Sequence, residues 1–95
     1  SWIYGTYQDS TKNNIYCFTE NNMVATITNN IEIDFDAAFS KAEVKEEKTN
    51  TLYKITINSQ DLISVYKFEY ITLTKINCSV SANGITAGNI TLYLQ

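Results

Sequence analysis

Apolar and polar side chains alternate along several short stretches of this chain. Residues 31–36 read Ile-Glu-Ile-Asp-Phe-Asp, and the same alternation covers residues 53–57 and 90–94. Because successive side chains of a β-strand point to opposite faces, the pattern predicts antiparallel strands with one packed face and one solvated face. The apolar set expected in the core is Ile33, Phe35, Ile55, Ile57, Leu92 and Leu94, and the polar set expected at the surface is Glu32, Asp34, Lys54 and Thr56.

Short asparagine-rich segments separate the alternating stretches. Asparagine tolerates left-handed backbone and hydrogen-bonds its own main chain, so in a chain without proline it marks the turns. Turns are predicted at residues 9–14, 20–22, 29–30, 48–50, 58–61, 83–84 and 87–89. Turns spaced by about 8 to 12 residues are typical of an all-β sandwich or barrel in which consecutive strands form hairpins.

These patterns predict an all-β fold, an antiparallel up-and-down barrel of about seven or eight short strands. A two-sheet β-sandwich is the alternative, because the same alternation suits it. Pairing of the first strand with the last would favour the barrel. We expect one domain over residues 1–95, trimmed from a longer precursor because the chain begins at Ser1 inside a strand pattern.

Two segments depart from the alternation. Within residues 65–80 the apolar parity slips twice, which would turn every later side chain to the other face unless the backbone absorbs it. We therefore predict a bulge or bend near Tyr70–Ile71 and a second within residues 73–76. Residues 36–42 place an aspartate before good helix formers and predict about one or two helical turns, followed by a strand through Val44.

The composition narrows the class of protein. A chain that is 44% hydrophobic and 18% charged is typical of a globular domain, and it contains no run of about 18 to 20 apolar residues that could span a membrane. The net charge is −3, and all seven basic residues are lysines. Because nucleic-acid-binding proteins usually have a basic face and arginine forks, we expect a soluble domain that binds no nucleic acid.

No catalytic motif is visible in the sequence. The absence of histidine removes the commonest general base, the Ser-His and Cys-His pairs and every His-containing zinc site. The three glycines match no phosphate-binding loop. Carboxylates at positions 32, 34, 36, 43, 46 and 47 could hold Ca²⁺ or act as acid and base, but their spacing matches no calcium loop and suits a solvated face. We expect a protein that is no enzyme and needs no metal or cofactor.

The aromatic residues supply the candidate binding surfaces, although most of them should form the core. Those expected to line the interior, and a ligand site within it, are Tyr16, Phe18, Phe35, Tyr53 and Phe68. At the start of the chain Trp2 and Tyr4 have the opposite parity to Ile3, Gly5 and Tyr7. With the latter set inside, Trp2 and Tyr4 would meet a protein partner or a second copy of the chain; in the opposite register Trp2 would lie in the interior.

The two cysteines, Cys17 and Cys78, are far apart and match no Cys-x-x-Cys pattern. As free thiols they would be small apolar core residues. As a disulfide they would close a long loop, which is worth about 4 kcal/mol in the chain-entropy model. The sequence leaves both alternatives open.

The opening segment resembles a known family. Residues 3–7, Ile-Tyr-Gly-Thr-Tyr, and residues 15–22, Ile-Tyr-Cys-Phe-Thr-Glu-Asn-Asn, are similar to the start of small bacterial lipocalin-like (calycin-like) β-barrel domains. Those domains read Gly-Thr-Trp and then an aromatic-x-Phe strand, and Tyr7 stands here where tryptophan plugs the barrel floor. The resemblance covers about the first 25 residues.

This resemblance implies a lipocalin-like barrel that binds a small apolar ligand, in a secreted or envelope-anchored bacterial lipoprotein. The alternative function is a protein–protein interaction or adhesion module that has a filled core and no ligand. Both hypotheses are non-enzymatic, and they differ in whether the interior has room for a small molecule.

Overall fold

The protein, described by a computed structural model, is built of β-strands. The structure describes residues 3–19, 23–28, 31–34 and 42–95, with side chains for 3–19 and 42–95. The strands are β1 (Gly5–Gln8), β2 (Asn14–Phe18), β3 (Met23–Thr28), β4 (Ile31–Asp34), β5 (Glu43–Lys48), β6 (Leu52–Ser59), β7 (Leu62–Thr72), β8 (Lys75–Ala82) and β9 (Ile85–Leu94). In the described part of the chain there is no helix, hence none long and apolar enough to cross a membrane. The helical turns predicted at residues 36–42 fall almost wholly outside the described ranges, whereas the strand expected through Val44 is β5.

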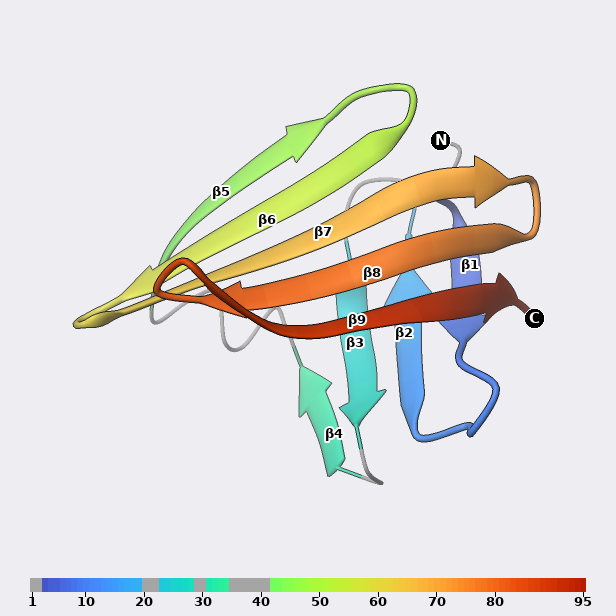
Figure 1. Cartoon of the computed structure of the whole chain (residues 1–95), viewed down its shortest axis with the longest axis horizontal. Coiled ribbons are helices and arrows are strands. Elements are labelled where there is room, and N and C mark those ends of the chain that lie inside the picture. Colours follow the sequence, from blue (N-terminus) through green and yellow to red (C-terminus); the bar gives the residue numbers. More distant parts are fainter. Residues whose placement is uncertain (1–2, 20–22, 29–30, 35–41) are drawn as a thin grey trace.

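The nine described strands form one antiparallel sheet in the order β4-β3-β2-β1-β9-β8-β7-β6-β5. Strands that follow one another in sequence are neighbours, and β1 also pairs with β9, with Tyr7 opposite Leu94 and Gln8 opposite Tyr93. The sheet curls into a half-barrel in which the long strands β8 and β9 cross in front of the shorter β1, β2 and β3 (Figure 1). β4 and β5 are the two edges, and no ladder joins them within the described strands.

This architecture confirms the all-β antiparallel class and the pairing of the first strand with the last. The described strands form a single sheet and not two packed sheets, so the sandwich alternative does not hold. The described residues form nine strands rather than about seven or eight. A turn at residues 73–74 divides the long apolar segment into β7 and β8. This turn is the second predicted break, and the first is confirmed as a register shift between Tyr70 and Thr72 that bulges Ile71 out of the ladder.

Residues with left-handed backbone close three of the predicted turns. They are Lys12 with φ 61°, Gln60 with φ 51°, and Asn83 with φ 49° followed by Gly84 with φ 83°. The turn predicted at residues 87–89 is wrong, because these residues lie inside β9, where a register shift opposite Val80 and Ser81 bulges out one residue, Ala87. A glycine inside a strand marks a bulge as readily as a turn. The predicted turns at residues 20–22 and 29–30 lie outside the described residues.

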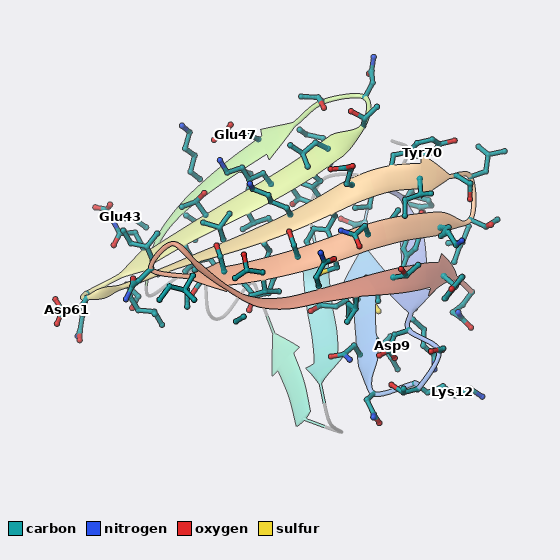
Figure 2. The ribbon with its side chains drawn as sticks, in the orientation of Figure 1. Asp9, Lys12, Glu43, Glu47, Asp61 and Tyr70 are labelled. Carbon is teal, nitrogen blue, oxygen red and sulfur yellow. The ribbon has the colours of Figure 1, made fainter. Side chains whose placement is uncertain are left out.

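Asp9 organises the loop between β1 and β2, where Figure 2 shows it close to Lys12. Its carboxylate accepts hydrogen bonds from the Thr11 hydroxyl at 2.9 Å, the Asn13 backbone N–H at 3.1 Å, and the Asn14 backbone N–H and side-chain amide at 3.2 and 2.8 Å. Burial, the largest single effect, opposes ionisation, but the hydrogen bonds from Asn14, Thr11 and Asn13 together hold the pKa of Asp9 below its usual range. This network sets the point at which β2 turns back along β1.

The core lies on the concave face of the half-barrel, and its buried members are Ile3, Tyr7, Tyr16, Phe18, Tyr53, Ile55, Phe68, Ile76, Cys78 and Leu92. Ile55 and Leu92 are buried as the alternation predicted, whereas Ile57 and Leu94 are half-buried and pack against the same core. Lys54 and Thr56 face the opposite, convex side, but they are half-buried and not exposed. Lys54 lines a groove of the convex face, which accounts for its partial burial. The side chains of Glu32, Ile33, Asp34 and Phe35 lie outside the described part of the structure.

Candidate functional site

Four of the aromatic residues predicted to line the interior form one packed cluster. Tyr16, Phe18, Tyr53 and Phe68 are each no more than 5% exposed. The Phe68 ring meets Phe18 edge-to-face at 4.9 Å between centroids and Tyr16 at 5.2 Å, and Phe18 lies 6.1 Å from Tyr53. Phe35, the other predicted member, is outside the described residues. Because these rings pack on one another, they fill the middle of the concave face instead of enclosing an empty barrel.

A pocket of about 290 Å³ lies beside this cluster. Asn14 and Tyr16 of β2 line one side, Tyr66 of β7 and two residues of β8 line the other, and residues 87–90 of β9 complete it. In the sheet, β2 is separated from β8 by both β1 and β9. The curl of the sheet therefore creates the pocket, because it brings strands that are not neighbours to face one another.

The pocket wall combines apolar surface with a few polar groups. Val80, Ile90 and the rings of Tyr16 and Tyr66 supply apolar surface, while Asn14 and the tyrosine hydroxyls supply hydrogen-bonding groups. Burial, and secondarily the neighbouring Cys78, raises the pKa of Tyr66, so this hydroxyl stays protonated at neutral pH. A mainly apolar wall with few polar groups is typical of small-molecule sites.

The thiol of Cys78 lines the same pocket and is 1% exposed. Burial raises its pKa to about 12, although a hydrogen bond with Tyr16 acts in the opposite direction. A thiol that stays protonated behaves as a small apolar surface and not as a nucleophile. Cys17 is half-buried and accepts a hydrogen bond from the Thr6 hydroxyl at 3.7 Å, and both cysteines are free.

We expect alkylation to distinguish the two thiols. Raising the pKa of Cys78 from 9.0 to about 12 lowers its thiolate population below pH 9 roughly a thousandfold. In native protein at pH 8, iodoacetamide should therefore modify Cys17 first and leave Cys78 intact until urea unfolds the chain, as followed by peptide mass spectrometry. Equal native rates at the two positions would contradict this environment for Cys78.

Gly88 keeps the pocket open from the β9 side. It pairs with Val80, whose side chain packs on the concave core, so a side chain at position 88 would also lie on that face. Gly88 is not among the residues with positive φ, and a Cβ built there meets no atom within 4 Å. Neither backbone conformation nor close packing requires glycine at this position. The effect of Gly88 is therefore to leave the pocket unfilled by a side chain. The sequence pattern placed Gly88 in a turn and missed it, although a glycine within a strand pattern is itself an indication of close approach by another group.

The first residues of the chain adopt the register in which Tyr4 faces outward. Ile3 and Tyr7 are buried, whereas Tyr4 is 60% exposed. Trp2, the other predicted interface residue, lies outside the described residues. Tyr4 is therefore separate from the pocket and available for another contact.

The candidate carboxylates of β5 lie on an edge strand of the sheet, where Figure 2 shows Glu43 and Glu47. Glu46 accepts a hydrogen bond from the Tyr53 hydroxyl at 2.5 Å, and Glu47 forms an ion pair with Lys45 at 3.3 Å. Within the described residues no three Cys, Asp or Glu side chains gather in a way that could hold a metal ion. Acidic and basic side chains on an edge strand discourage pairing with other chains.

In comparisons with known proteins, no family model, no curated protein and no solved structure matches this chain.

Proposed function

We propose that this protein is a non-enzymatic, lipocalin-like domain that binds a small apolar ligand on the concave face of its barrel. The domain is proposed to belong to a secreted or envelope-anchored bacterial protein, as the resemblance of its opening segment implies. The observation that carries the binding function is the pocket between β2 and β7 to β9. The wall of this pocket is aromatic and aliphatic, with hydrogen-bonding groups at Asn14 and Tyr66. It therefore supports ligand binding better than it supports an interaction module with a filled core.

The size of the pocket determines the size of the ligand. Ligand pockets generally have volumes of about 300 to 1,000 Å³, and this pocket, at about 290 Å³, is at the lower end of that range. The Tyr16, Phe18 and Phe68 rings pack on one another beside this pocket and occupy the space next to it. A compact ring-bearing or short-chain molecule with one polar group fits better than a retinoid or a long fatty acid.

A ligand screen by thermal unfolding tests this proposal. A ligand present at about 100 times its Kd stabilises the folded state by about 2.7 kcal/mol, which for a domain of this size raises Tm on the order of 10 °C. We expect such a shift with compact probes such as indole or octanoate and none with retinol or sugars. Gly88→Leu should abolish the shift, because a Cβ at this position meets no atom within 4 Å and the longer side chain would extend into the pocket.

Thr91→Leu is the matched control. It places the same side chain on β9 but on the convex face, because Thr91 pairs with Asn77 one position from the inward-facing Ile76 and Leu92. This variant should retain the ligand-induced shift. Equal shifts in wild type and Gly88→Leu would reject the pocket as the site.

A lack of any shift across the screen would leave the second candidate function, an interaction module without a ligand. The exposure of Tyr4 favours that alternative, because monomers gain little from showing a large aromatic side chain. Tyrosine is also one of the residues most enriched in the energetic centres of protein interfaces.

A further inference from the structure

A second hollow lies on the convex face of the sheet, on the side away from the concave pocket. It has a volume of about 300 Å³, and its polar lining comes from Lys54, Lys67, Ser79, Ser81 and Thr86. These residues come from the four consecutive strands β6, β7, β8 and β9. The polar lining therefore comes from the sheet, and Gly84 of the β8–β9 turn also lines the groove.

The strand register places these residues in two adjacent rows. Lys54 lies opposite Lys67, and Lys67 opposite Ser79. In the next row Ser81 lies opposite Thr86. Side chains directly opposite one another in an antiparallel sheet have Cβ atoms about 4.5 to 5.5 Å apart, so the two ammonium groups and three hydroxyls can reach a common ligand.

The register places the two lysines, which carry like charges, directly opposite one another. Neither Lys54 nor Lys67 forms an ion pair with any described residue. Glu47 lies opposite Lys54 but is bound to Lys45 at 3.3 Å, and Glu69, two positions along β7 from Lys67, makes no ion pair with it. Like charges placed directly opposite in a sheet are destabilising. An anion held between the two lysines would replace this repulsion by attraction.

We propose that this groove binds a small molecule that carries a tetrahedral oxyanion, a phosphate or sulfate group. Lysine ammonium groups act as point charges toward such groups, and serine and threonine hydroxyls donate hydrogen bonds to their oxygens. A planar carboxylate is better matched by the paired donors of arginine, which the chain lacks. The groove volume of about 300 Å³ leaves space for the rest of a small ligand beside the oxyanion.

Titration of ¹⁵N-labelled protein with inorganic phosphate, sulfate and acetate tests this site, with sodium chloride holding the ionic strength constant. Phosphate or sulfate should shift the amide resonances of residues 54, 67, 79, 81 and 86 in a saturable manner. The anion that binds with the lower Kd identifies the oxyanion group that the natural ligand carries. Lys54→Gln and Lys67→Gln should each weaken binding by about tenfold. Lys12→Gln, which removes one charge in the β1–β2 loop, should leave the affinity unchanged.

The lysine variants should remain folded, since each removes one member of a repelling pair. The Tm of Lys67→Gln without ligand should equal or exceed that of wild type, because Lys67 lies opposite Lys54 and Ser79 and no carboxylate. Acetate binding as tightly as phosphate, or shifts that persist unchanged in Lys54→Gln, would overturn the proposal. So would the absence of any saturable shift with both tetrahedral anions. Because Gly88→Leu blocks only the concave pocket, oxyanion binding by that variant separates this site from the apolar-ligand site.

Discussion

Phe68→Ala is expected to lower the free energy of unfolding by about 3 to 5 kcal/mol. Phe68 is completely buried and lies at the centre of the aromatic cluster, with ring contacts to Tyr16, Phe18, Tyr53 and Tyr66. Truncation removes buried apolar surface and leaves a cavity. It also removes the ring contacts, each of which contributes about 0.5 to 1.5 kcal/mol in addition to the effect of its buried area. A domain of this size has a total stability of only about 5 to 15 kcal/mol, so Tm should fall by roughly 15 °C or more. Urea unfolding followed by circular dichroism measures the change.

Two variants make this result specific to the cluster. Leu73→Ala truncates an apolar side chain that is 82% exposed and should alter stability by less than about 0.5 kcal/mol. Phe68→Leu retains most of the volume and should cost about 1.5 kcal/mol. A Phe68→Ala cost as small as that of Leu73→Ala would mean that the cluster is not the centre of the core.

The sequence predicted the strands well because side-chain alternation is a local property. In β6 the parity of Tyr53, Ile55 and Ile57 matches the concave face. Asn83–Gly84 forms its turn because both residues tolerate positive φ. The same local logic failed at residues 87–89, since a bulge and a turn draw on the same residue types and only pairing with β8 decides between them.

The pocket was harder to predict, because it depends on the curl of the sheet. Tyr16 was expected in the interior from its own strand, but Tyr66, Val80 and Gly88 become its neighbours only when β7 to β9 face β2. The convex groove has a similar origin. Lys54 and Lys67 look like ordinary solvated lysines in the sequence, and the β6–β7 register places them opposite one another.

Gly5→Ala is expected to destabilise the protein by about 2 to 3 kcal/mol, mainly through the backbone. Gly5 has φ +128°, a conformation that side-chain-bearing residues rarely adopt. A Cβ at this position would also lie 2.9 Å from Leu94 Cδ1, although that methyl group can move. β1 therefore begins with a glycine whose backbone has positive φ and passes close to Leu94 of β9. Two residues later, Tyr7 is buried in the core. Urea unfolding of the variant measures the cost.

The three glycines of the chain form a matched series for this prediction. Gly84 has φ +83° and a built Cβ there meets no atom within 4 Å, so Gly84→Ala isolates the backbone cost, which should be about 1 kcal/mol or more. Gly88 has neither positive φ nor a close neighbour, so Gly88→Ala should be neutral or stabilise by about 0.4 to 1 kcal/mol. In a Leu94→Ala background, Gly5→Ala should still cost most of its full value, because only the contact is relieved. If the cost disappears there, the contact with Leu94 and not the backbone explains the requirement for glycine.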